Sequence, residues 1–167
     1  MFQAIRSKLD NISTIKRLCE RAEAHALQDQ QREPGAEHFL LAALDLPDGT
    51  ARLALEQAGV EPDALRAAIE RQYADALRSI GLKAGIPVGA PMPANPGVYR
   101  AAFSGRDIMQ ELAATRKDHS PLLGAHVVGI VAGMPHGVAA RALRALDIDP
   151  VVLKSTADAI AEASRIH

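Results

Sequence analysis

Apolar residues recur at helical spacing along the first half of the chain and predict four helices there. The first runs from Ser13, a residue suited to a helix N-cap, to about residue 30. The second spans about 36–46, and the third runs from Thr50 to a stop at Gly59. The fourth opens with Glu61-Pro62, because proline is tolerated in the first turn of a helix, and continues to about residue 80.

The second half follows the same order of elements. Ser104 is expected to cap a helix that ends near residue 117, and two further helices are expected over about 122–133 and 137–146. The last helix starts at Asp149-Pro150, which is again an acidic residue followed by proline. The pattern therefore predicts an all-α protein with eight helices in two halves.

An internal repeat supports this division. Shifting the sequence by 88 positions gives eight identities, without a gap, over the 28 positions 38–65. The identical pairs are His38 and His126, Pro47 and Pro135, Gly49 and Gly137, Ala51 and Ala139, Ala54 and Ala142, Leu55 and Leu143, Pro62 and Pro150, and Leu65 and Leu153. We therefore expect one eight-helix bundle of two four-helix repeats related by a pseudo-twofold axis.

A segment rich in glycine and proline separates the repeats. Eight of the seventeen residues from Gly81 to Gly97 are Gly or Pro, and no helical period continues through them. The predicted organisation is an N-terminal extension over 1–12, a first repeat over 13–80, a linker over 81–98 and a second repeat over 99–167. The extension is expected to form a short separate helix.

Composition and charge agree with helices and exclude several classes of protein. Apolar residues make up 48% of the chain and aromatic residues only 3%, which favours close-packed helices over a β-sandwich. A net charge of -1 marks no nucleic-acid or membrane-surface binder. One cysteine, Cys19, allows no internal disulfide, and no signal peptide or membrane span is apparent, so we expect a cytoplasmic protein.

The segment from Gly35 to Glu70, GAEHFLLAALDLPDGTARLALEQAGVEPDALRAAIE, resembles the N-terminal repeat domain of the Clp-type AAA+ unfoldases ClpC and ClpA. The second copy, from Gly124 to Leu153, resembles the same pattern, and Phe103-Ser104-Gly105-Arg106 resembles the Phe-Thr-Pro-Arg that opens that family's second repeat. The resemblance implies a bundle that docks substrates and adaptor proteins. The sequence contains no phosphate-binding loop of the type G-x-x-x-x-G-K-[ST], so we expect neither ATP binding nor ATP hydrolysis.

The resemblance also implies candidate binding residues. In ClpC-like members, the Glu of each Gly-Thr-Glu-His segment and a Thr from the first helix of the same repeat help to bind phosphorylated arginine. Here Glu37 retains the carboxylate and Ser13 lies near the place of the hydroxyl, whereas Ala125 replaces the second Glu. Ser104 and Arg106, which open the second repeat, are further candidate residues. Because Ala125 has no carboxylate, a single degenerate site is expected. The alternative is that Glu37 is merely an acidic residue favoured in a first helical turn.

Other reactive side chains favour structural roles. His38 and His126 recur in both copies, but neither has a second ligand three or four residues further on, so hydrogen bonding to a neighbouring helix end or loop is expected rather than a metal site. His119 and His136 are expected to face solvent, and Cys19 to act as a small buried hydrophobe. No nucleophile, base and acid arrangement indicates an enzyme.

The expected function is a non-catalytic binding module without cofactors. Its expected partners are protein clients or adaptors of a Clp unfoldase, the unfoldase itself, or peptide-like small molecules, and not nucleic acid or membranes. It could deliver clients, compete for them or sequester them. Two alternatives remain: a metal- or His-dependent hydrolase using His38 or His126, and a helical DNA-binding regulator, although the helices lack a basic recognition face.

Overall fold

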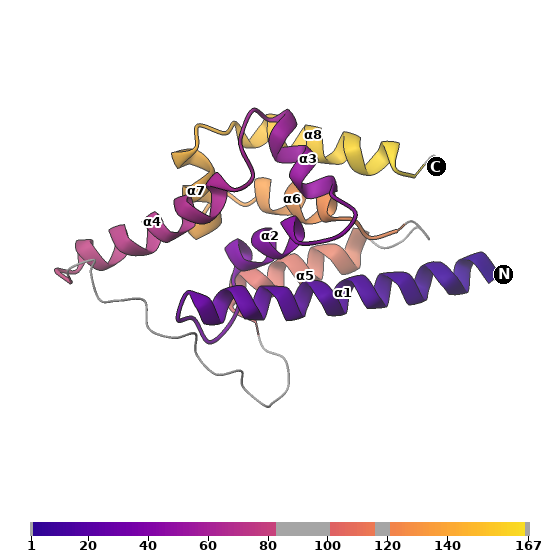
Figure 1. Cartoon of the computed structure of the whole chain (residues 1–167), viewed down its shortest axis with the longest axis horizontal. Helices are drawn as coiled ribbons and strands as arrows, with labels where there is room; N and C mark the ends of the chain where they lie inside the picture. Colours follow the sequence, from indigo (N-terminus) through magenta and orange to yellow (C-terminus); the bar gives the residue numbers. More distant parts are fainter. Residues whose placement is uncertain (1, 83–100, 116–120, 166–167) are drawn as a thin grey trace.

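The computed structural model describes residues 2–82, 101–115 and 121–165. These residues form eight α-helices and no strand, so the predicted all-α fold is confirmed for them (Figure 1). None of their helices has the length and apolar character needed to cross a bilayer. Most of the predicted linker over 81–98, and His119, lie outside the described residues.

The first helix differs from its prediction. Helix α1 (Phe2–Gln28) runs unbroken for 27 residues, so the extension is helical as expected. It is continuous with the first helix and not a short helix of its own, and the N-cap at Ser13 was wrong. No Gly or Pro interrupts this segment, and serine costs little inside a helix when its side chain faces solvent, as that of Ser13 does. The N-terminal half of α1 reaches the right edge of Figure 1, and its Ile5, Leu9 and Ile12 are exposed.

The remaining helices of the first repeat are α2 (Ala36–Leu44), α3 (Thr50–Gln57) and α4 (Ala64–Ser79). Gly59 has a φ of 82° and follows the end of α3, as expected for a left-handed helix cap. Helix α4 begins two residues after Pro62 instead of at it, so the predicted Glu61-Pro62 start was too early.

The second repeat contains α5 (Phe103–Thr115), α6 (Gly124–Ala132), α7 (Val138–Ala145) and α8 (Pro150–Ala163). Here the predicted acid-proline start is confirmed, because the Asp149 carboxylate accepts the N–H of Val151 at 2.8 Å and Pro150 is the first helical residue. Ser104 is not the cap of its own helix, since α5 already begins at Phe103.

The core lies around α2 and α6, which contact each other in the middle of the bundle. Every residue of α2 is buried, and so are seven of the nine residues of α6. Around them the repeats interlock: α3 of the first repeat packs against α8, and α7 of the second repeat packs against α4. Each third helix therefore contacts the fourth helix of the other repeat, as a twofold relation between the repeats requires.

Candidate functional site

The two repeated histidines hold the starts of the two central helices. Nδ1 of His38 accepts the backbone N–H of Gly35 at 2.9 Å, and Nδ1 of His126 accepts that of Leu123 at 3.0 Å. Each bond satisfies one of the N–H groups that a helix N-terminus leaves without a partner inside the helix. Both rings therefore have the structural role that was expected. Burial also lowers the pKa of His126 below its usual value, which keeps that ring neutral.

The start of α5 packs directly on the start of α2. Oγ of Ser104 accepts the N–H of Ala36 at 3.0 Å, and the N–H of Ala102 donates to the carbonyl of Pro34 at 3.1 Å. A Cβ on Gly105 would lie 2.4 Å from the same carbonyl oxygen, so only glycine permits this approach. We call this contact the α2–α5 junction. It brings Ser104 next to Glu37, although 68 positions separate Ser104 from Ala36 in the sequence.

The start of α6, the counterpart of α2 in the second repeat, is likewise held by residues of the other repeat. At the start of α6, Oδ1 of Asn11, from α1, accepts the N–H of Leu122 at 2.8 Å. The hydroxyl of Thr50 accepts the N–H of Ala125 at 2.9 Å, and the Asp48 carboxylate accepts that of Gly124 at 3.2 Å. In both cases residues of the other repeat hold the start of the central helix: Ser104 at α2, and Asn11, Asp48 and Thr50 at α6.

The position of Ser13 along α1 corrects the expected pairing of Glu37 with Ser13. Ser13 is exposed on α1 and lies about 18 Å along the helix axis from His25, twelve residues on. His25 is the α1 side chain that reaches the surroundings of Glu37, through Arg66 and Asp29. Arg106 is also exposed, and its Nε donates to the carbonyl of Ala101 at 2.9 Å. Of the expected residues, the structure therefore brings only Ser104 to Glu37.

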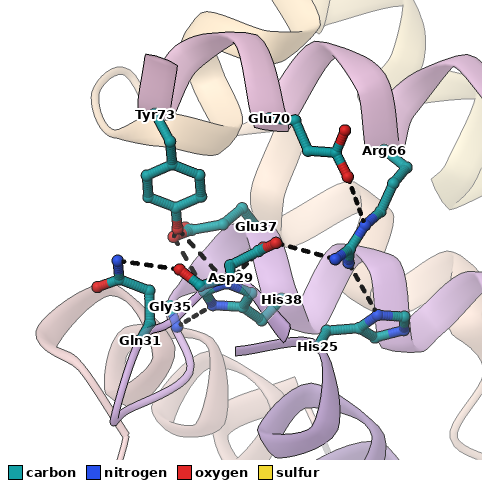
Figure 2. Close-up of polar contacts among 9 residues, drawn as sticks. All are labelled: His25, Asp29, Gln31, Gly35, Glu37, His38, Arg66, Glu70 and Tyr73. Atoms are coloured by element: carbon teal, nitrogen blue, oxygen red, sulfur yellow. Dashed lines mark hydrogen bonds and ion pairs between the residues drawn. The ribbon is translucent and has the colours of Figure 1, made fainter. Parts of the chain in front are cut away.

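Glu37 lies inside a polar network and not on an open surface. Only 7% of its surface is exposed, and its Oε1 accepts the hydroxyl of Tyr73 from α4 (Figure 2). Burial, together with the negative charge of Glu37 and the hydrogen bond to it, raises the pKa of the Tyr73 phenol above its usual value. The phenol is thus kept as a hydrogen-bond donor to the carboxylate.

Asp29, directly after α1, joins the rest of this network. One carboxylate oxygen accepts Nε2–H of His38 at 3.1 Å, and the other accepts Nη2–H of Arg66 at 2.8 Å. Because Nδ1 of His38 is an acceptor, the ring proton must be on Nε2. Arg66 also donates to Glu70 and to Nδ1 of His25. We call these residues the Asp29 network; its members are His25, Asp29, Glu37, His38, Arg66, Glu70 and Tyr73.

The Asp29 network was not predicted. Its hydrogen bonds and ion pairs connect α1, α2 and α4, which is a structural role. Both ring nitrogens of His38 are used in hydrogen bonds, which leaves neither to act as a base on a substrate. Among the residues that the structure describes, no group of three or more His, Cys, Asp or Glu side chains could hold a metal ion. Cys19 is half-buried and packs against the apolar core. His136 is exposed.

The fold and the junctions define an all-helical domain of two interlocked four-helix repeats. Residues 13–90, just under half of the chain, match the family model of the Clp repeat (R) N-terminal domain. The resemblance of the chain to the Clp N-terminal domain family is thereby confirmed. The match supports a Clp-related protein-interaction module in this part of the chain. No curated protein matches the chain.

Proposed function

We propose that the chain is a cytoplasmic, non-catalytic module that docks clients or adaptors of a Clp unfoldase, and that it does so at the α2–α5 junction. The observation that carries this proposal is the bond from Ala36 to Ser104, which joins the two repeats at that point. Next to this bond, Phe103 has 80% of its surface exposed. A large exposed aromatic side chain on a rigid backbone is typical of a residue that anchors a protein partner.

A second part of the proposal concerns phosphoarginine. Glu37 and Ser104 lie on the two sides of the α2–α5 junction, so a carboxylate for a guanidinium and a hydroxyl for a phosphate are available from different repeats. Tyr73 already uses Oε1 of Glu37, so a guanidinium has to compete with the phenol. The matching place in the second repeat has the methyl group of Ala125, and its junction is closed by Asn11, Asp48 and Thr50. We therefore expect one weak site.

The docking proposal is tested by capture from a lysate of the source organism. Wild-type protein should recover a Clp ATPase, one of its adaptors or their clients, identified by mass spectrometry. Phe103→Ser should lose most of this recovery, because it removes the exposed ring without disturbing the core. Val152→Ser, an exposed residue on α8, is the matched control and should recover the same proteins as the wild type. Equal recovery by the Phe103 variant would show that partners dock elsewhere.

The phosphoarginine part is tested by calorimetric titration of free phosphoarginine. Glu37→Ala should weaken binding about tenfold, which is the effect of removing one charge-assisted hydrogen bond of about 1.4 kcal/mol. Tyr73→Phe should strengthen binding, because it releases the carboxylate from its internal donor. Binding that ignores both substitutions, or two equivalent sites, contradicts the assignment to Glu37.

A further inference from the structure

The second repeat contains a largely apolar pocket. It has a volume of about 510 Å³ and lies between the end of α6, α7 and the start of α8. Most of its lining is apolar, with Ala132, Ala140, Leu143, Ile148 and Val151 among the residues that form it. A pocket of this size and lining is suited to side chains of a bound partner.

In the first repeat, one arginine occupies the corresponding place. In the first repeat, Arg52 on α3 donates from Nε to the carbonyl of Leu44 at 3.2 Å and from Nη1 to Asp63 at 3.2 Å. Its side chain therefore spans from the end of α2 to the start of α4. At the 88-residue offset these three residues correspond to Ala132, Ala140 and Val151, all of which line the pocket. At this pocket the second repeat therefore has a methyl group where the first repeat has a bridging side chain.

The charges at the pocket define what can occupy it. Its lining has two cations, Arg144 and Lys154, and one anion, Asp158. Oδ2 of Asp158 already accepts a hydrogen bond from Lys154 at 3.0 Å. Arg144 donates to the carbonyl of Pro135 at 2.9 Å, and a guanidinium has further N–H donors for a carboxylate. An apolar pocket with a net positive rim is complementary to an aliphatic side chain that has an acidic neighbour.

Val151, at the start of α8, lies at the edge of the pocket. Val151 lines the pocket with 75% of its surface exposed, and Val152 next to it is 49% exposed without lining the pocket. Val151 can therefore contact a bound partner, whereas Val152 lies outside the pocket.

We propose that this pocket binds a peptide segment of a protein partner that combines a Leu, Ile or Val side chain with an adjacent Asp or Glu. The aliphatic side chain enters the pocket against Leu143 and Ile148, and the acidic side chain pairs with Arg144 and Lys154. This inference rests on the proposed function, because it names the chemistry of a second contact for the partner of the same module. The pocket is separate from the α2–α5 junction, so the two contacts are tested independently.

The test uses three blocked octapeptides and the full chain labelled with ¹⁵N. The first has Leu-Leu flanked by glutamates, the second has the glutamates replaced by lysines, and the third has the leucines replaced by serines. The first peptide should shift the amide signals of Met134, Val151 and Lys154. The other two should bind at least about tenfold more weakly, since one buried leucine or one charged hydrogen bond is worth about 1.5 kcal/mol or more.

Matched variants assign the binding to the pocket. Val151→Glu should weaken binding of the first peptide about tenfold or more, whereas Val152→Glu adds the same charge one residue away and should leave it nearly unchanged. The double variant Ala140→Arg with Val151→Asp copies the Arg52–Asp63 bridge of the first repeat and should abolish the signal shifts at Met134. The three positions changed in these variants, 140, 151 and 152, lie on α7 or α8. Unfolding in urea checks that each variant retains the fold.

Several results would overturn the pocket proposal. Equal effects of the two valine variants would contradict binding in the pocket. Equal binding of the lysine peptide would contradict the role of the charges at the pocket. A monomer–dimer equilibrium that Val151→Glu abolishes would make a second copy of the chain the occupant. Shifts around Phe103 with unchanged pocket signals would overturn the pocket while leaving the docking proposal intact. Conversely, pocket binding together with partner capture that ignores Phe103→Ser would overturn the α2–α5 docking proposal alone.

Discussion

The two repeats use opposite chemistry to hold their second and fourth helices. Between α2 and α4, the Asp29 network supplies hydrogen bonds and ion pairs, with Tyr73 donating to Glu37. Between α6 and α8, the helices pack directly: a Cβ on Gly129 would lie 2.9 Å from the Asp158 carboxylate and 3.8 Å from Cβ of Ala157. At the 88-residue offset, Leu41 stands in place of Gly129, and Tyr73 stands in place of Ala161.

The same fold thus accommodates two ways of holding the second helix of a repeat to the fourth. A glycine facing α8 permits close helix packing, and dispersion contacts then replace polar ones. In the first repeat Leu41 stands at that place, α4 packs less closely on α2, and the side chains of the Asp29 network connect the two helices. Such buried polar networks are costly to break because each lost partner leaves a desolvated group behind.

The largest expected effect comes from the centre of the Asp29 network. Asp29→Ala should lower the free energy of unfolding by about 3 kcal/mol, because it leaves His38 and Arg66 without their shared acceptor. Only 6% of the Asp29 side chain is exposed, whereas the Asp158 side chain is 59% exposed. Asp158→Ala is the control and should cost less than about 1 kcal/mol. Urea unfolding of both variants measures the contrast, and equal losses would show that the Asp29 network stabilises nothing beyond a surface pair.

The second effect comes from the close packing of α6 and α8. Gly129→Leu introduces the residue of the first repeat and should cost about 2 kcal/mol, because the added side chain has to push the Asp158 carboxylate aside and fit against Ala157. Gly133→Ala, at the end of the same helix, should change stability by less than about 0.5 kcal/mol, since its φ of -78° suits alanine and a Cβ meets nothing closer than 3.4 Å. A Gly129→Leu protein as stable as wild type would mean that helix spacing does not depend on this glycine.

The sequence predicted the second repeat better than the first. The 88-residue offset found both central helices, and Asp149-Pro150 begins α8 as expected because the Asp149 carboxylate caps it. Glu61-Pro62 has the same pattern, yet α4 begins at Ala64, so the acid-proline pair did not fix that start. The break at Ser13 failed because a serine is a cap only where the backbone leaves the helix, and nothing before it forces that.

The candidate site was less predictable than the helices. Glu37 and Ser104 were chosen from their motifs, but no motif shows that the start of α5 packs on the start of α2. Asp29, Arg66 and Tyr73 belong to three separate segments, and no spacing in the sequence connects them. In the sequence, the one sign of these contacts is that the second repeat has different residues at the offset positions, namely Lys117, Lys154 and Ala161.

A smaller effect is expected at Tyr73. Tyr73→Phe should cost about 1 kcal/mol at neutral pH, because it removes one hydrogen bond to Glu37. The raised pKa of Tyr73 adds a pH dependence: the unfolded phenol ionises near 10.0 while the folded one stays protonated. Stability that is complete below that value is therefore lost as the pH rises above it. Absorbance titration of a Tyr99→Phe background, which leaves Tyr73 as the single tyrosine, measures this; a phenol that ionises near 10 in the folded protein contradicts it.

The smallest effect is expected at acidic pH and concerns His126. Burial lowers its folded pKa, so the unfolded ring takes up a proton first as the pH falls below 6.5. The contribution of His126 is thus present above that value and is lost on acidification. Asparagine can accept the Leu123 N–H without titrating, so His126→Asn should show a flatter stability curve between pH 7 and 5 in urea unfolding. Parallel curves for the two proteins would assign acid sensitivity to other groups.

The interlocking of the repeats also bears on how such a chain arises. Since α3 packs on α8 and α7 packs on α4, a single four-helix unit would expose the apolar faces that its neighbour covers. Two identical copies of that unit could cover each other through the same contacts, as a symmetric homodimer does. Duplication and fusion of one gene would convert that dimer into a single chain, and only then could one half acquire Arg52 and Tyr73 while the other kept Ala140 and Ala161.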